Sequence, residues 1–151
     1  MTLTLRQQNA LDLVKQLHGQ WDVALLMGFI EHESSFNPAA FLNDKNGGSY
    51  GLFQLNLQTA EDRGFTGTAL ELYYPPTNIN FAVKHLDWIK DYLTKHECYS
   101  EENLVAAYNE GAHGVVLGRK VPFYVTAVLA AKARWEVILS PKETENDSTS
   151  A

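Results

Sequence analysis

Residues 23–35 read VALLMGFIEHESS, and this stretch decides the fold. Its first eight residues are apolar on every side of a helix, a pattern typical of a helix buried in the centre of a domain. Asp22 precedes the stretch, and its side chain is suited to cap the helix start. Pro38 disfavours the helical conformation for Asn37, so the helix is predicted to end there. We therefore expect a central helix with other elements packed around it.

Two glutamates, Glu31 and Glu33, lie at the end of this stretch. Each continues an apolar row of the helix, so geometry alone does not separate them. A carboxyl group near a helix C-terminus lies among unpaired carbonyls, where negative charge is disfavoured, and burial acts in the same direction. Both effects raise a carboxyl pKa toward the range that a general acid needs near neutral pH. Glu33 is closer to the helix end, and the alternative for either residue is an ordinary solvated glutamate.

Composition and charge limit the class of protein. A chain of 151 residues is long enough for one domain with its own core, and 45% hydrophobic with 20% charged residues is ordinary for a globular protein. No apolar run approaches the roughly 18 residues that span a membrane, so no membrane insertion is expected. The formal net charge of −6 argues against a nucleic-acid partner. We expect a monomer.

Cysteine and histidine usage predicts neither a disulfide within the chain nor a metal site. Cys98 is the single cysteine. The five histidines lack the spacing of metal ligands. The segment HECYSEE, which begins at His96, is explained equally well by a solvated helix end. No metal and no cofactor are predicted.

Further helix signals follow along the chain. A capping box at Thr4 starts an N-terminal helix, and Asn78 begins a helix with a long apolar face. Ser100 is expected to cap another helix, and Pro122 suits the first turn of the last one. A short helix is expected at residues 59–64. Together these signals predict an all-α fold of about six helices.

Residues 39–56, AAFLNDKNGGSYGLFQLN, break the helical pattern. They are predicted to form a long ordered loop with a short β-hairpin at Gly47 and Gly48. A loop of about 15 residues or more inside a compact domain is usually functional. The last segment, residues 141–151, is acidic and polar and is predicted to be a disordered tail. Residues 1–140 are then expected to form a single folded domain.

Three short motifs occur along this domain. Glu33–Ser34 lies in ESSFNPAA, GLFQ occupies residues 51–54 in GSYGLFQLN, and AYN occupies residues 107–109 in AAYNEGAHGV. In this order and spacing they resemble the signatures of the soluble lytic transglycosylases, relatives of goose-type lysozyme, over residues 22–128. The resemblance implies a lysozyme-like fold with Glu33 as the catalytic acid. Glu31 would then face elsewhere.

The resemblance also implies a reaction. The substrate would be the β-1,4 bond between N-acetylmuramic acid and N-acetylglucosamine in the glycan strands of peptidoglycan. Glu33 would protonate the leaving oxygen, and the 6-hydroxyl of the same muramic acid would close a 1,6-anhydro ring without water. No cofactor is implied, and residues 1–140 would be a lytic transglycosylase-like catalytic domain.

The motifs imply which residues bind the substrate. Gln54 and Asn109 carry neutral amides suited to acetamido groups, and Tyr108 is expected to hydrogen-bond near the catalytic acid or the substrate. Tyr124, in a Tyr-Val pair that resembles a later family element, is expected to line the cleft. The full set of expected substrate-binding residues is Ser34, Ser49, Tyr50, Gln54, Tyr108, Asn109 and Tyr124.

Three neighbouring positions carry further expectations. Gly51 would allow the backbone to approach a sugar closely. Tyr50 and Phe53 offer flat faces for sugar rings, with core packing as the alternative. Phe53 also stands where methionine is commoner in the family. The segment GRKVPFY, which ends at Tyr124, lacks the glutamate with which many members hold the peptide stem.

Two other functions compete with this interpretation. A goose-type lysozyme would hydrolyse the bond with an aspartate that positions water, for which Asp44 is the candidate. Asn56 occupies a place where goose-type enzymes often have aspartate, which favours the transglycosylase. A non-catalytic sugar-binding or structural module is the second alternative, and the presence of Glu33 argues against it.

The N-terminal residues lack the basic start and apolar stretch of a secretory signal. The implied substrate lies outside the cytoplasm. We therefore expect a bacteriophage lysin or a virion-associated enzyme, brought to the cell wall in the periplasm by a holin or by the infecting particle. A domain of a longer bacterial protein is the alternative.

Overall fold

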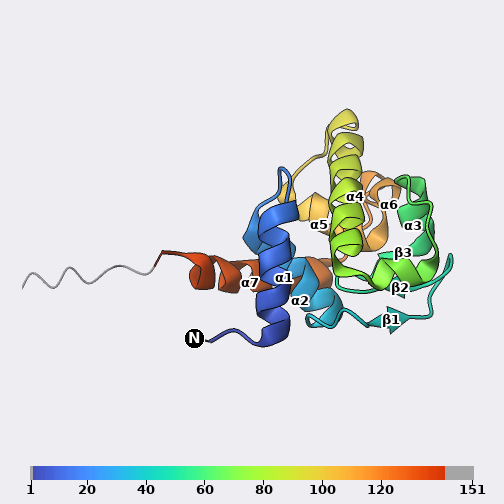
Figure 1. Cartoon of the computed structure of the whole chain (residues 1–151). Helices are drawn as coiled ribbons and strands as arrows, with labels where there is room; N and C mark the ends of the chain where they lie inside the picture. The colour runs from blue at the N-terminus through green and yellow to red at the C-terminus, as the bar shows by residue number, and fades with distance from the viewer. Residues whose placement is uncertain (1, 142–151) are drawn as a thin grey trace, which may run out of the picture.

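The computed structural model describes residues 2–141, which contain seven α-helices, one 3₁₀-helix and a three-stranded sheet (Figure 1). The predicted all-α, lysozyme-like class is confirmed, and the sheet is small. The helices are α1 (Leu5–Leu17), α2 (Val23–Ser34), α3 (Leu57–Asp62), η1 (Ala69–Tyr73), α4 (Pro75–Lys95), α5 (Glu101–Glu110), α6 (Ala112–Val116) and α7 (Pro122–Leu139). The strands are β1 (Phe41–Leu42), β2 (Ser49–Tyr50) and β3 (Leu55–Asn56).

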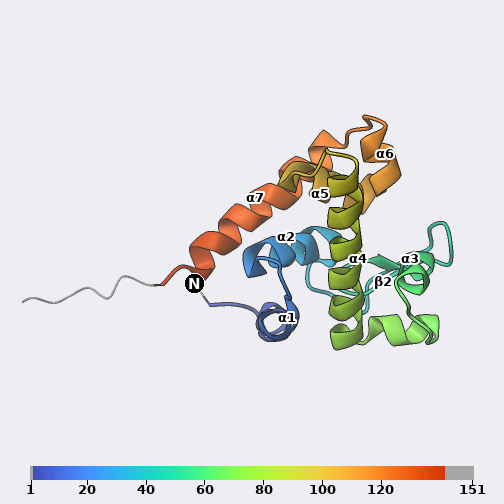
Figure 2. The ribbon, with the colours of Figure 1, turned by 90° about the horizontal axis from the view of Figure 1, so that it is seen from above.

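Helix α2 lies at the centre of the core, as its apolar run predicts. Leu26, Met27, Phe29 and Ile30 have no exposed surface. Its most extensive packing partner is α7, and the two helices lie side by side (Figure 2). At Gly28 the helices meet backbone to backbone, because a Cβ atom added there would lie 2.9 Å from the carbonyl oxygen of residue 128. Only glycine permits this distance.

Three of the predicted helix N-caps are confirmed. The Thr4 side chain accepts from the Gln7 backbone N–H in a capping box. Asp22 accepts from the N–H of residue 24, and Ser100 accepts from the N–H of residue 103. These caps satisfy backbone N–H groups that have no partner within the helix.

The end of α2 differs from the prediction. The helix stops at Ser34 because Ser35 and Phe36 adopt left-handed conformations, with φ of 49° and 64°. The turn therefore comes before Asn37, and the restriction imposed by Pro38 is not what ends the helix.

The predicted loop at residues 39–56 contains the whole sheet. The strand order is β1-β2-β3, and both pairs are antiparallel. Phe41 pairs with Tyr50, and Ser49 pairs with Asn56. The predicted hairpin at Gly47 and Gly48 is confirmed as the connection between β1 and β2.

Helix α4 starts earlier than predicted. It begins at Pro75 rather than Asn78, because two prolines occupy its first positions, where a missing N–H costs nothing. The short elements α6 and η1 were not predicted. The predicted acidic tail lies, apart from Pro141, outside the described residues. Among residues 2–141, no helix is both long and apolar enough to cross a bilayer.

Candidate active site

Glu33 lies in the last turn of α2, where it is partly buried. Burial raises the pKa of its carboxyl group from 4.5 to about 7. The Tyr124 hydroxyl, from the first turn of α7, donates to Glu33 Oε1 at 2.6 Å. This hydrogen bond favours the ionised carboxylate and so opposes part of the rise in pKa. Glu33 is therefore a carboxyl group that both holds and releases a proton near neutral pH.

Tyr124 is a buried donor with a defined orientation. It is 9% exposed, and the ring of His32 packs edge-on against it with ring centroids 4.9 Å apart. Burial and the charge of Glu33 raise the pKa of the Tyr124 hydroxyl, so that it keeps its proton. The pair joins the C-terminal end of α2 to the start of α7.

Glu31 points to another part of α7. Its carboxylate accepts hydrogen bonds from Arg134 and from Trp135 Nε1, the latter at 3.3 Å. Arg134 follows Tyr124 by ten residues, about 15 Å along the helix axis. The two glutamates are thus hydrogen-bonded to different parts of α7, Glu33 to its start and Glu31 to its C-terminal half.

Asn78, which was predicted only as a helix start, anchors the loop that carries the second motif. It is fully buried. Its Oδ1 accepts from the Phe53 N–H at 2.9 Å, and its Nδ2 donates to the carbonyls of Tyr50 and Leu72 at 2.7 and 2.8 Å. The available signal in the sequence was an asparagine on the apolar face of a helix, where a buried amide needs several partners.

Gly51 makes room for this anchor. It has φ of +72°, and an added Cβ would lie 2.7 Å from Asn78 Nδ2. The absence of a side chain therefore lets the loop approach Asn78. The expectation that Gly51 makes room for a sugar has no support in this packing.

Gln54 and Tyr108 stabilise the same loop. Gln54 has a left-handed backbone with φ of 47°, and its Nε2 donates to the carbonyls of Ala40 and Gly51, both at 3.1 Å. The Tyr108 hydroxyl donates to the Phe53 carbonyl at 2.7 Å. Tyr108 also packs on Phe29 of α2, with ring centroids 4.9 Å apart. The motifs therefore meet in space, with Tyr108 linking α5 to both of the others.

The remaining predicted residues differ in whether their side chains are already hydrogen-bonded within the protein or exposed. Ser34 donates to the carbonyl of residue 30, and the buried Ser49 donates to Asp44 Oδ2 at 2.7 Å. Tyr50 is 8% exposed and donates to the carbonyl of residue 47. Asn109 is exposed at the end of α5. Substrate binding by these residues stays a prediction.

The expectation that Phe53 offers a face to a sugar is wrong. Its ring has no exposed surface and packs near Phe29 and Tyr108, so it belongs to the core. An apolar residue in the family position is retained here for packing.

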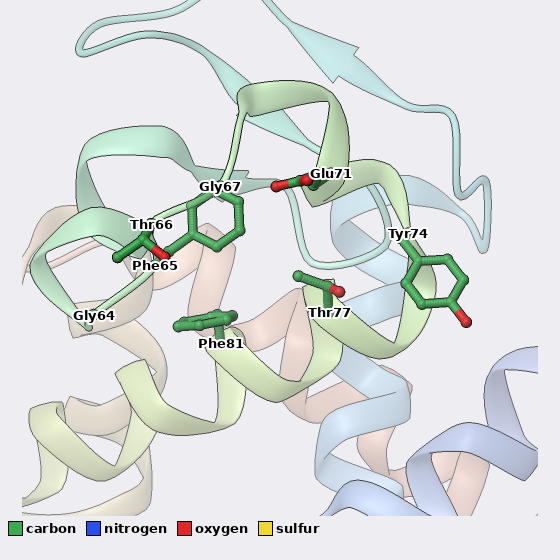
Figure 3. Close-up of a pocket in the computed structure, with 8 residues that line it drawn as sticks. All are labelled: Gly64, Phe65, Thr66, Gly67, Glu71, Tyr74, Thr77 and Phe81. Atoms are coloured by element: carbon green, nitrogen blue, oxygen red, sulfur yellow. The ribbon is translucent and has the colours of Figure 1, made fainter.

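An open pocket of about 580 Å³ lies elsewhere, between residues 64–67, η1 and the start of α4 (Figure 3). None of the predicted site residues lines it. Its one carboxylate, Glu71, accepts from the Thr68 N–H at 2.9 Å as part of a capping box. We find no chemistry in this pocket that competes with Glu33.

Comparisons with known proteins identify the family of the chain. The Transglycosylase SLT domain family matches residues 13–117. The fold is similar to that of an inactive glutamate-to-glutamine mutant of lytic transglycosylase Slt from Pseudomonas aeruginosa, with a TM-score of 0.68 and 18% identity. The match covers 89% of this chain but only 24% of that chain. A search of curated proteins found no match. The extent of the family match shows that this chain belongs to the transglycosylase SLT domain family.

Proposed function

We propose that this protein cleaves the β-1,4 bond between N-acetylmuramic acid and N-acetylglucosamine in peptidoglycan and forms 1,6-anhydro-muramic acid. The observation that carries the proposal is Glu33, a partly buried carboxyl group with a pKa of about 7 and one donor, Tyr124. A single group of this kind can act first as an acid and then as a base. Family membership supports the same reaction class.

The reaction uses the carboxyl group of Glu33 twice, first as an acid and then as a base. Protonated Glu33 gives its proton to the glycosidic oxygen as the bond from that oxygen to the anomeric carbon breaks. The resulting carboxylate is stabilised by the Tyr124 hydroxyl at 2.6 Å. It then takes the proton of the 6-hydroxyl while O6 bonds to the anomeric carbon. Glu33 returns to its starting state, and no water is consumed.

The contacts of two other residues argue against a water-activating second carboxylate. Asp44 is exposed in the β1–β2 connection, where it accepts from Ser49 Oγ. Asn56 caps α3 by accepting from the N–H groups of residues 58 and 59, and its amide donates to the carbonyls of residues 45 and 48. Asn56 is thus a structural residue that holds the hairpin and starts a helix.

The product distinguishes the proposed reaction from hydrolysis. Muropeptides released from purified cell walls should end in 1,6-anhydro-muramic acid, about 18 mass units lighter than hydrolysed ends, because an intramolecular hydroxyl replaces water. Mass spectrometry checks this. Asp44→Asn should keep the rate within roughly tenfold, whereas a base that positions water contributes about 10²–10⁴. Mainly reducing ends, together with loss of activity in Asp44→Asn, would instead identify a goose-type lysozyme.

Tyr124→Phe should shift the pH dependence of lysis. Activity requires protonated Glu33 and so declines as pH rises through its pKa of about 7. The lost hydrogen bond had favoured the carboxylate, so the pKa of Glu33 should rise further. We expect the alkaline midpoint of kcat/KM to move about one pH unit higher, since a hydrogen bond to a charged group contributes about 1.5 kcal/mol. Tyr74→Phe, at a 63% exposed tyrosine, is the control. An unchanged midpoint in Tyr124→Phe would show that the hydroxyl does not act on Glu33.

The biological setting is part of the proposal. Peptidoglycan lies outside the cytoplasmic membrane, so the enzyme must be delivered to it. We propose that residues 1–140 act as a monomeric catalytic domain on glycan strands, in a bacteriophage lysis enzyme or a virion-associated enzyme. Complementation of a lysis-deficient phage would test the first setting, and detection of the protein in purified particles would test the second.

A further inference from the structure

A row of four aromatic rings runs along one side of α4. His85, Trp88, Tyr92 and His96 are spaced by three or four residues and therefore share a helix face. Neighbouring rings are stacked, with centroids 6.0, 5.1 and 4.4 Å apart and interplanar angles of 12°, 27° and 27°. We call these four residues the aromatic row.

The aromatic row starts at the candidate active site. The ring of His85 lies 5.9 Å from that of Tyr108, centroid to centroid. Tyr108 in turn lies close enough to Glu33 for that carboxylate to raise the pKa of its hydroxyl. The row then leads away from Glu33 along α4.

Two other elements border the row. The Arg63 guanidinium, at the end of α3, lies 3.9 Å from the centre of the Trp88 ring. On α6, His113 Nδ1 lies 3.2 Å from the Tyr92 hydroxyl. Helices α3 and α6 both lie next to α4 (Figure 2). The row therefore contacts residues of both neighbouring elements and, through His85 and Tyr108, residues near Glu33.

Trp88 differs from the other two tryptophans of the chain. Trp21 and Trp135 are 7% and 1% exposed, and their Nε1 atoms donate to Asp87 and Glu31. Trp88 is 37% exposed, and its indole N–H has no partner among residues 2–141. Trp88 is thus the tryptophan with the most exposed surface, and exposed aromatic rings are common in binding sites.

Polar atoms in the row, and in Arg63 beside it, lack hydrogen-bond partners. Arg63 Nε and His85 Nδ1 are buried and have no hydrogen-bond partner within the described chain. Buried polar atoms without a partner are uncommon in folded proteins. Burial and the nearby Arg63 charge lower the pKa of His85 to about 4, so its ring is neutral at pH 7. The exposed rings of the row are suited to a ligand with both apolar and hydrogen-bonding parts.

We propose that the aromatic row binds N-acetylated sugar units of the glycan strand beyond those held at Glu33. This inference rests on the proposed function, because it requires a polymeric substrate at Glu33. Sugar rings carry apolar C–H groups together with hydroxyl and acetamido groups, which match the exposed ring edges and N–H donors of the row. The row then lengthens the binding site along α4, and long chains bind better than short ones.

The test compares chito-oligosaccharides of two lengths in a Glu33→Gln chain, which does not consume them. Isothermal titration with the hexamer should show about tenfold weaker binding after Trp88→Ala, because one aromatic contact contributes about 1.4 kcal/mol. Binding of the trimer, which fits at Glu33, should be unchanged. Tyr99→Ala is the matched control, since Tyr99 is 39% exposed and lies beside Lys90 instead. It should change neither affinity.

Fluorescence gives an independent measurement. Trp88 is the exposed tryptophan, so the hexamer should change the emission, and Trp88→Phe should abolish this change while keeping hexamer affinity within about threefold. Undiminished hexamer affinity in Trp88→Ala, or an equal loss for trimer and hexamer, would overturn the inference and leave the proposed function intact. Failure of the Glu33→Gln chain to bind either oligosaccharide would overturn both.

Discussion

Glu33→Gln should reduce the lysis of purified peptidoglycan by about 10³-fold or more. The amide cannot donate the proton to the glycosidic oxygen or accept the proton of the 6-hydroxyl, and general acid–base catalysis typically contributes about 10²–10⁴ for each step. Turbidity loss of a cell-wall suspension measures the effect. The amide keeps the size of the side chain and still accepts from Tyr124.

Glu31→Gln is the control for this experiment, because it makes the same chemical change two residues away. Glu31 bonds to Arg134 and Trp135, and its ion pair lies near the surface, where such pairs contribute at most about 1 kcal/mol. The variant should retain most of its activity. An inactive Glu31→Gln beside an active Glu33→Gln would reverse the assignment.

Thermal unfolding separates loss of catalysis from loss of folding. The folded protein raises the pKa of Glu33 from 4.5 to about 7, so the folded state binds the proton more tightly than the unfolded chain. The free energy of unfolding therefore falls as pH rises from 4.5 to 7, by about 3 kcal/mol at most. Glu33→Gln removes this pH-dependent loss of stability. Above pH 7 the variant should therefore be at least as stable as the parent protein. A lower melting temperature there would attribute the loss of activity to misfolding.

Asn78→Ala should lower the free energy of unfolding by about 3–5 kcal/mol. It leaves the Phe53 N–H and the carbonyls of Tyr50 and Leu72 without their buried partner, at about 1–3 kcal/mol for each group. For a domain of this size the melting temperature should fall by about 10 °C. Calorimetry measures the change, and activity at low temperature should also fall because the loop beside Glu33 loses its anchor.

Asn80→Ala is the matched control, because Asn80 lies on the same helix with its side chain exposed. It should leave the melting temperature within about 2 °C, as expected for a surface position. If Asn78→Ala melted like Asn80→Ala, the three hydrogen bonds of Asn78 would have no net effect on stability.

The sequence predicts those parts of the fold that depend on neighbouring residues. The caps Thr4, Asp22 and Ser100 act on N–H groups two or three residues away, so their signals are local. The apolar run in α2 likewise shows directly that the helix is buried. The hairpin follows from the paired glycines at its turn.

Other features depend on residues that are distant along the chain. Asn78 resembled a helix start, but its partners are the backbone groups of a loop up to 28 residues earlier. The hydrogen bond from Tyr124 to Glu33 joins residues that are 91 positions apart in the sequence. Phe53 lies between Leu52 and Gln54 in a glycine-containing loop, and only the packing against Phe29 and Tyr108 shows that it is in the core. Position near the helix end favoured Glu33 and the family resemblance chose it as the candidate acid, whereas the origin of its raised pKa required the structure.

The contact at Gly28 has a consequence for how such an enzyme adapts. Glu33 lies five residues beyond Gly28, about 7 Å along the axis of α2, and Tyr124 lies one turn from the carbonyl that Gly28 touches. The spacing of two rigid helices therefore sets how well the phenol reaches the carboxyl group. The hydrogen bond to the reacting group therefore depends on a residue that has no side chain and does not touch that group. Substitutions that change the distance between α2 and α7 could therefore adapt the enzyme to more acidic or more alkaline cell walls. Glu33 and Tyr124 would both be kept.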